Sequence, residues 1–270
     1  MNDKQQLTER DVPVEQLQAI ERLVQLVDTL RIHCPWDRKQ TVASLMPHLL
    51  EECHELADAI AAHDQANTTE ELGDLLMGAL MMARVALDDG GFDIIKVCDN
   101  VCEKLIRRHP HVYGEVEVAD GDEVLQNWEQ IKKQEKADKG EAKSALSGVP
   151  SSLPALLKAY RVGQKAANSG FDWPDLDGPT AKVEEEWAEL QEAIADGDKQ
   201  RIIDEMGDML FALTNMARKL KIEPEMALRG TVARFTSRFN YVEQELGDKL
   251  ASATLEEMDV LWDVAKSKEK

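Results

Sequence analysis

The sequence predicts an all-α protein built from two tandem, related helical bundles. Three observations support this fold class. Apolar residues recur at intervals of three and four along most of the chain, and no segment shows the sustained alternation of a strand. Glycine and proline are scarce, at 15 and 9 of 270 residues, and only 5% of residues are aromatic. A set of acidic and apolar residues also recurs at one constant offset, which indicates duplication.

The duplicated segment carries four acidic residues on two consecutive predicted helices. They are Glu52, Glu55, Glu71 and Asp74 in the first copy, and Glu186, Glu189, Glu205 and Asp208 in the second, with a shared offset of 186 − 52 = 134. Apolar residues spaced as one helix face recur with them: Leu49, Cys53, Leu56 and Ile60, then Val183, Trp187, Leu190 and Ile194. We expect this apolar seam to face the core of each bundle.

The repeat divides the chain into two domains. We expect the first helical domain over residues 13–137, a linker over 138–152, and the second helical domain over 153–270. The linker assignment rests on charged and small residues together with Gly140, Gly148 and Pro150.

In the first domain, an amphipathic helix is predicted over about 14–32, and Pro35 breaks it by disfavouring helical backbone in the preceding residue. The acidic pair of helices follows, over about 42–63 and 68–88. The other expected elements are a helix over about 92–108, a loop over 109–114 and a helix over about 121–137.

The second domain repeats this order. Its predicted helices lie over about 153–168, 180–196, 199–220, 225–245 and from 255 onward. The loop Gly170–Pro174 corresponds to the loop that contains Trp36 in the first domain.

The net charge of −20 argues against binding to a nucleic-acid polymer or to an anionic membrane. No apolar run is long enough to span a bilayer, and no signal peptide is recognisable. We therefore expect a cytoplasmic protein whose four cysteines are reduced.

The chemistry carried by the repeat combines acids, bases and an aromatic ring. Carboxylates gathered beside an apolar seam repel one another, so they take up protons or hold a cation. Mg²⁺ prefers carboxylate and phosphate oxygens, arginine matches phosphate geometry, and an indole can stack on a base. Each copy has two bases four residues apart and a Trp-x-x-x-Lys pair: Lys104, Arg108, Trp128 and Lys132, then Arg234, Arg238, Trp262 and Lys266. This combination suits a nucleoside triphosphate.

With these residues the chain resembles the MazG family of nucleoside triphosphate pyrophosphohydrolases, in its full-length tandem form. The resemblance extends over nearly the whole chain. Its motifs are the EExxE and ExxD pairs of both copies, Cys34-Pro35-Trp36-Asp37, Arg107-Arg108-His109-Pro110-His111-Val112 and Gly170-Phe171-Asp172-Trp173. The resemblance implies Mg²⁺-dependent hydrolysis between the α and β phosphates, which releases a nucleoside monophosphate and pyrophosphate. Mn²⁺ is the alternative ion.

The resemblance also implies roles for individual residues. The eight repeated acids are the expected metal ligands, and the catalytic set is Glu185, Glu186 and Glu189. Glu185 or Glu186 would orient the attacking water or accept its proton. Lys182, Arg234, Arg238 and Lys266 would neutralise the triphosphate, with Trp262 near the nucleoside, and Lys104, Arg108, Trp128 and Lys132 are the first-copy substrate set.

The second copy is the leading candidate for the hydrolase, whereas the first stays open between catalysis on other nucleotides, regulation and a structural role. Relatives assemble their sites from paired bundles, which implies a homodimer.

Three alternatives are weighed against this interpretation. The acidic faces could be solvated helix surfaces, but their recurrence in register disfavours this. Glu51 and His54 have the spacing of a di-iron site, yet the second copy has Ala188 in place of the histidine, and an all-oxygen set favours Mg²⁺ or Mn²⁺. A non-catalytic nucleotide sensor or helical interaction module would bind triphosphates without releasing pyrophosphate.

Overall fold

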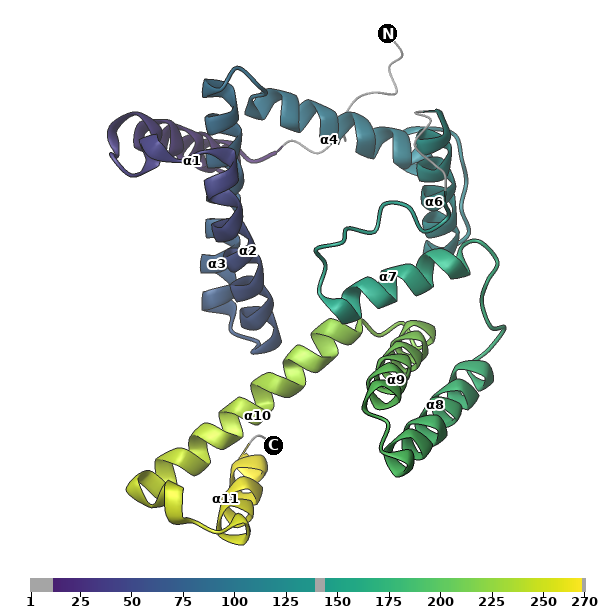
Figure 1. Ribbon diagram of the computed structural model, residues 1–270. Helices are drawn as coiled ribbons and strands as arrows, with labels where there is room; N and C mark the ends of the chain where they lie inside the picture. Colours follow the sequence, from purple (N-terminus) through teal and green to yellow (C-terminus); the bar gives the residue numbers. More distant parts are fainter. Residues whose placement is uncertain (1–11, 139–143, 269–270) are drawn as a thin grey trace. The chain divides into compact units, whose positions relative to one another are not determined.

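A computed structural model describes residues 12–138 and 144–268 (Figure 1). Every regular element in these ranges is helical, which confirms the all-α class. The chain divides into two compact units: Met1–Ile60 with Asp64–Ala142, and Lys143–Lys270 with Ala61–His63. Residues 139–143 of the predicted linker lie outside the described ranges, so the domain boundaries stay a prediction.

The described residues of the first unit form six α-helices and one short 3₁₀ turn. They are α1 (Val14–His33), η2 (Asp37–Lys39), α2 (Val42–Ala61), α3 (Gln65–Asp88), α4 (Ile94–Arg108), α5 (Pro110–Tyr113) and α6 (Gly121–Asp138). The expectation of a loop over 109–114 is wrong, because α5 forms there. Pro110 stands in the first turn of α5, where a missing N–H costs nothing and the fixed φ suits a helix.

The core of the first unit lies where α1 and α2 pack against α3. Val27 of α1, Leu45 of α2 and Met81 of α3 are all buried in one cluster. Two ion pairs hold α1 to α3 beside this core: Arg31 to Asp88 at 2.8 Å and Arg84 to Asp28 at 2.7 Å. The core therefore holds the beginning of α2 and the end of α3 in place, and the acidic residues of both helices lie outside this cluster.

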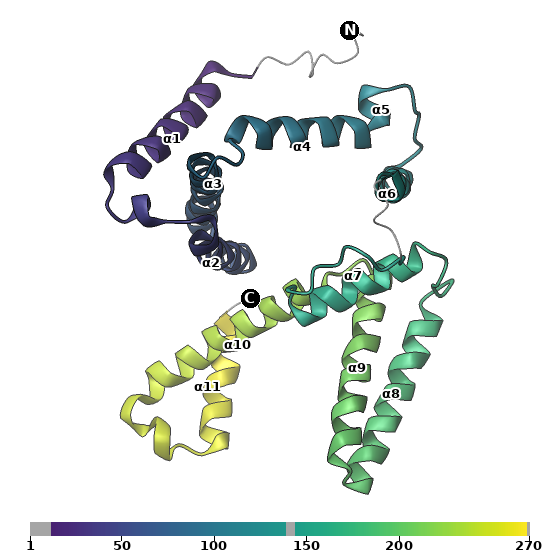
Figure 2. The same ribbon diagram turned by 45° about the horizontal axis from the view of Figure 1, so that its top comes forward.

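The second unit repeats the helical plan. Its elements are α7 (Ala155–Ala167), α8 (Asp177–Asp196), α9 (Lys199–Lys219), α10 (Pro224–Leu246), η3 (Gly247–Ser252) and α11 (Leu255–Lys268). The helices α8 and α9 lie side by side and antiparallel in both views (Figures 1 and 2). The helix α7 packs against α9, and α10 packs against α11.

The turn between the two acidic helices has the same construction in both units. The Asp64 carboxylate accepts from the backbone N–H groups of Ala66 and Asn67 and caps α3. Asp198, 134 residues later, caps α9 in the same way. The residue before each cap has a positive φ: 55° at His63 and 71° at Gly197. This shared turn sets the antiparallel pairing of acidic helices in each unit.

The prediction that the apolar seam faces the core holds only in part. Leu190 is buried, but Cys53, Ile60, Trp187 and Ile194 are exposed. Half of the Trp187 surface is accessible, at 50%. The reason is geometric: two paired helices cover only the faces that meet, so apolar residues on the remaining face stay uncovered within one chain.

Candidate metal and nucleotide site

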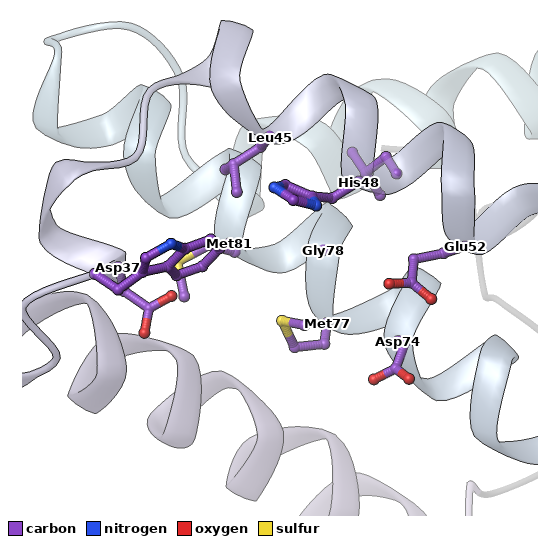
Figure 3. Close-up of a pocket in the computed structure, with 10 residues that line it drawn as sticks. Asp37, Leu45, His48, Glu52, Asp74, Met77, Gly78 and Met81 are labelled. Carbon is purple, nitrogen blue, oxygen red and sulfur yellow. The ribbon is translucent and has the colours of Figure 1, made fainter.

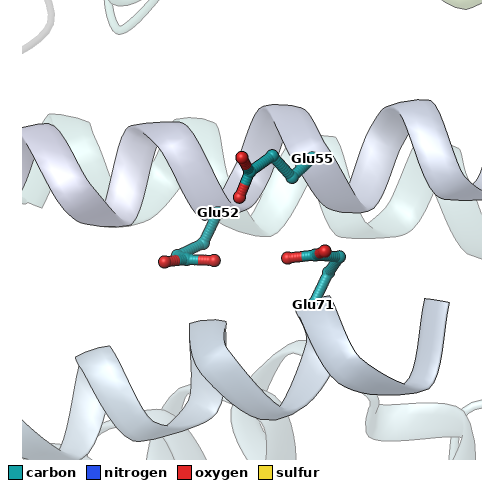
Figure 4. A group of neighbouring side chains, drawn as sticks. All are labelled: Glu52, Glu55 and Glu71. Atoms are coloured by element: carbon teal, nitrogen blue, oxygen red, sulfur yellow. The ribbon is translucent and has the colours of Figure 1, made fainter. Parts of the chain in front are cut away.

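In the first unit, the helices α2 and α3 point acidic side chains at one another. Glu52 and Asp74 line a common pocket (Figure 3). Glu52 and Glu55 from α2 meet Glu71 from α3, and oxygen atoms of all three lie within 4.8 Å of one another (Figure 4). The structure thus brings together three of the four predicted acids in one compact group and places Asp74 beside it.

Burial and mutual repulsion perturb these acids. The pKa of Glu52 is raised above its ordinary value, first by burial and then by the negative charges of Asp74 and Glu55. The pKa of Glu71 is raised for the same two reasons, with Glu55 as the largest charge, although a hydrogen bond with Glu52 lowers it. The negative charge of these carboxylates is therefore not fully compensated by neighbouring positive charges.

The second unit contains two overlapping groups of acids. Glu185, Glu186 and Glu189 form one, and Glu186, Glu205 and Asp208 form the other, each with oxygen atoms within 4.8 Å. Glu186 belongs to both and is buried, with 5% of its surface exposed. All four predicted acids of this copy, with Glu185, therefore converge on one place between α8 and α9.

Lys182 is the cation nearest this centre. Its Nζ lies 2.8 Å from Glu185 Oε1 and 2.6 Å from Glu186 Oε1. These contacts raise the pKa of Lys182, so its ammonium is held firmly in the charged form. Here Lys182 neutralises acids, whereas the sequence predicts that it neutralises phosphate.

Arg201 is a residue that the sequence reasoning missed. Its guanidinium lies 3.5 Å from Glu205 and also pairs with Glu192 and Asp196. The available signal was its position four residues before Glu205 on one helix. Asn67 stands at the corresponding place in the first copy, so the first unit has no equivalent cation there.

The remaining charge of the second centre suits a divalent cation. Five acids gather there, and among the described residues Lys182 and Arg201 are the cations that pair with them. The pKa of Glu189 is raised by burial and then by Glu205 and Glu186, which reflects the uncompensated charge. Carboxylate oxygens are the donors that Mg²⁺ and Mn²⁺ prefer. The donor set therefore fits such an ion.

The basic residues and the tryptophan predicted to bind substrate in the second copy lie on α10 and α11. Arg238 stacks over the Trp262 ring at 5.6 Å, and Phe235 packs on the same ring at 5.0 Å. Arg234 and Lys266 are exposed. This set lies on α10 and α11, whereas the acids lie on α8 and α9.

In the first copy, the corresponding residues gather on α4 and α6. Arg108 and Lys132 lie 5.8 and 4.7 Å from the centre of the Trp128 ring. Glu135, which the sequence reasoning missed, binds Arg108 at 2.5 Å, and Arg107 and Arg108 lower the pKa of Glu135 to about 2. Lys104 is exposed. The cation Arg108 of the first copy is thus already neutralised within its own unit.

No helix in the described part of the chain is long and apolar enough to cross a membrane. The four cysteines are free, and Cys53, Cys98 and Cys102 are exposed.

Known proteins share this organisation. Residues 40–113 match the family model of the MazG nucleotide pyrophosphohydrolase domain, and residues 165–234 match that of phosphoribosyl-ATP pyrophosphohydrolase. A nucleoside triphosphate pyrophosphohydrolase of Escherichia coli K12 is 38% identical over 263 residues, which covers 94% of this chain and 99% of the relative. The nucleoside triphosphate pyrophosphohydrolase/pyrophosphatase MazG of Thermotoga maritima is 41% identical over 251 residues, 91% of this chain and 95% of that protein.

Among solved structures, the chain matches a MazG-related protein from Thermotoga maritima with 34% identity and a TM-score of 0.39, over 42% of this chain and 98% of that one. The two full-length relatives match both halves of the chain, including both copies of the acidic helices. The chain therefore belongs to the MazG family of nucleoside triphosphate pyrophosphohydrolases.

Proposed function

We propose that the acidic centre of the second unit is the active site of this enzyme. The protein hydrolyses nucleoside triphosphates to nucleoside monophosphates and pyrophosphate, as a member of its family. The observation that supports this placement is the pair of overlapping carboxylate groups that share the buried Glu186. The first unit gathers three acids in one such group, whereas the second gathers five in two.

The proposed metal ligands of this site are Glu186, Glu189, Glu205 and Asp208. When bound, Mg²⁺ would polarise the phosphates and lower the pKa of a nearby water. Mn²⁺ would serve in its place, since it takes the same donors. The corresponding first-unit ligands are Glu52, Glu55, Glu71 and Asp74.

Glu185 is the proposed acceptor of the proton from the attacking water. Its side chain is 55% exposed and lies within the same carboxylate group as Glu186 and Glu189, so it can reach a water at the rim of the centre. Lys182 holds Glu185 and Glu186 by direct contacts, which fixes where both carboxylates point. Glu186 itself is too enclosed to meet bulk water and is better placed as a ligand.

The proposed substrate set is Lys182, Arg234, Arg238, Lys266 and Trp262. Trp262, with Arg238 stacked on it, offers a face for the nucleoside. Lys182 lies beside the acids on α8, whereas the other four residues lie on α10 and α11. We propose that a homodimer joins the acids of one chain to these four residues of the other.

Exposed apolar residues of α9 support the homodimer. They recur at intervals of three and four and form a stripe that we call the α9 stripe: Ile203, Met206, Leu210 and Leu213. Trp187 and Ile194 of α8 are exposed as well. A continuous uncovered stripe of this kind marks an interface between chains. We also propose a cytoplasmic location, where nucleoside triphosphates are available.

The reaction is tested by incubating the full chain with each nucleoside triphosphate and Mg²⁺. We expect equal amounts of monophosphate and pyrophosphate, and no turnover after chelation with EDTA until Mg²⁺ or Mn²⁺ is restored. Release of orthophosphate in place of pyrophosphate, or tight binding without turnover, would contradict the proposal and favour the sensor alternative.

A further inference from the structure

A pocket of about 160 Å³ in the first unit lies beside the acids but outside the set of ligands discussed so far (Figure 3). Its apolar lining includes Leu45 of α2 with Met77 and Met81 of α3. Trp36 and His48 also line it, with their rings edge to face and 5.8 Å apart. Pockets for whole small molecules usually measure about 300 Å³ or more, so this one suits a single ring system.

Asp37 gives this pocket a hydrogen-bond acceptor. The residue is 9% exposed and lines the pocket. Arg31 donates to its backbone carbonyl, but no described residue donates to its carboxylate. The oxygens of this carboxylate are not among the described buried side-chain atoms that lack a partner, so they stay accessible from the pocket. They can therefore accept hydrogen bonds from a ligand that enters it.

The second unit shows what the first one lacks. In its corresponding loop, Asp172 is bound by Arg218 at 2.5 Å and by Lys219 at 3.0 Å. Arg84 stands 134 residues before Arg218, but it pairs with Asp28 and Asp88 instead. The loop aspartate of the second unit is therefore neutralised from within, whereas that of the first is left for a ligand.

Two residues of the pocket wall also differ between the units. A Cβ atom added at Gly78 would lie 2.8 Å from Leu49 Cδ2, and both residues line the pocket. The second copy has Ala212 at the place of Gly78 and the polar Asn215 at the place of Met81. The first unit thus has no side chain and a thioether at two places where the second has a methyl group and an amide.

We propose that this pocket binds the base of a guanine nucleotide, with the Asp37 carboxylate accepting from two neighbouring N–H groups of the base. An ionised carboxylate accepts only, through two parallel oxygens. Guanine presents two adjacent donors, its ring N–H and its amino group. Adenine and cytosine place a ring nitrogen lone pair beside their amino group, which repels the second oxygen.

The rest of the nucleotide has a place beside the base. Trp36 and the two methionines flank a planar ring. Glu52 and Asp74 at the other end of the pocket belong to the proposed metal-binding acids, so phosphates would be reached through a divalent ion. Only the contact of the phosphates through a divalent ion rests on the proposed function. Binding of the base requires no catalysis in either unit.

The test uses the full chain with Glu189→Gln and Glu205→Gln, which weaken the second centre. Binding of α,β-methylene analogues of GTP, ITP and ATP is measured by calorimetry with Mg²⁺ present. Inosine lacks only the amino group of guanine. We expect the guanosine analogue to bind about tenfold or more tightly than the inosine and adenosine analogues, because each loses one charged hydrogen bond and leaves an oxygen unpaired.

Two further variants examine the pocket itself. Asp37→Asn should weaken the guanosine analogue by about tenfold or more. The matched control Asp99→Asn, on the exposed surface of α4, should not change binding. Gly78→Ala should also weaken binding, because Leu49 must move into the pocket. Circular dichroism checks that each variant is folded. The comparison of the guanosine and inosine analogues uses a chain whose pocket residues are unsubstituted, so it does not depend on the folding of a pocket variant.

Equal affinity for the three analogues, no binding of any of them, or equal affinities of Asp37→Asn and Asp99→Asn would overturn the inference. Failure of the proposed function is distinct from these outcomes, since it appears as absent pyrophosphate release by the unsubstituted chain.

Discussion

Glu186 and Glu189 differ in how their charge is balanced, although they are three residues apart on α8. Glu186 contacts Lys182 at 2.6 Å, whereas Glu189 faces the acids Glu205, Glu186 and Glu185, and burial with these charges raises its pKa. Glu189 therefore gains most from a cation.

We expect Glu189→Gln, in a chain whose first copy is disabled by Glu55→Gln, to lose at least about 100-fold of its Mg²⁺-dependent turnover. Changes to residues that only hydrogen-bond to metal ligands already cost about 10- to 100-fold. Pyrophosphate release at several Mg²⁺ concentrations measures this. Glu184→Gln is the matched control, because Glu184 is exposed on the same helix. Full activity of the Glu189 variant would remove this residue from the metal site.

The raised pKa values of Glu52, Glu71 and Glu189 predict how metal-free stability depends on pH. A carboxyl group whose pKa is higher in the folded state stabilises the fold below its unfolded pKa, near 4.5, and this contribution is lost as the pH rises through the raised pKa. Mg²⁺ competes with these protons. We expect the rise in melting temperature on adding Mg²⁺ to be larger at pH 8 than at pH 5. At 100 times its dissociation constant the ion would add about 2.7 kcal/mol to the free energy of unfolding. A shift independent of pH would contradict this.

Asp172 is perturbed in the opposite direction. Arg218 and Lys219 lower its pKa from 3.8 to about 2, so its stabilisation is present above pH 4 and is lost as the pH falls towards 2. We expect Asp172→Asn to lower the free energy of unfolding by about 2 kcal/mol at pH 7 and by much less at pH 2. Denaturant titrations at both pH values measure this, with the exposed Asp259→Asn as control. Equal losses at both pH values would mean that the ion pairs do not stabilise the second unit.

At the scale of elements, the two acidic helix pairs share one turn but differ in its first residue. His63 adopts φ 55° where the second unit has Gly197 at 71°. A side chain in left-handed backbone is strained, whereas glycine is not.

We therefore expect His63→Gly to stabilise the first unit by about 1 kcal/mol and Gly197→Ala to destabilise the second by a similar amount. Thermal unfolding followed by circular dichroism measures both. A destabilised His63→Gly variant would show that the imidazole makes contacts that outweigh the backbone strain.

At the scale of the molecule, the α9 stripe and Trp187 are among the apolar features that a single chain leaves exposed. We expect the protein to sediment as a dimer and Trp187→Glu to shift it towards monomer, because burying an unpaired carboxylate in an interface costs several kcal/mol. Gln191→Glu, which adds the same group at an exposed polar position of α8, should leave the dimer intact.

Loss of turnover in the Trp187 monomer would support an active site shared between chains. A monomeric wild-type protein with full activity would exclude the shared site.

The repeat made much of the fold and of the acidic centres predictable. Helix periodicity located the helices, and the 134-residue offset indicated that Glu52 and Glu186 occupy equivalent places. The short helix α5 is not predictable from the sequence pattern, because four residues are too few to show a helical period. The expectation that the whole apolar seam faces the core is wrong in part. The periodicity of apolar residues alone does not distinguish a helix face that packs against a neighbouring helix from a face that stays exposed.

Local order along one helix, such as Glu186 three residues before Glu189, follows from the sequence by itself, because helical geometry puts such residues on one face. Duplication and fold class follow from it too, since they depend on spacing, and the motifs of both copies carry the resemblance to the family. Only the tertiary structure decided which charges pair between separate elements: Asp172 is bound by Arg218 and Lys219, whereas no described residue donates to the carboxylate of Asp37. Ion pairing depends on distances of a few ångströms between separate helices, and no spacing along the chain determines them.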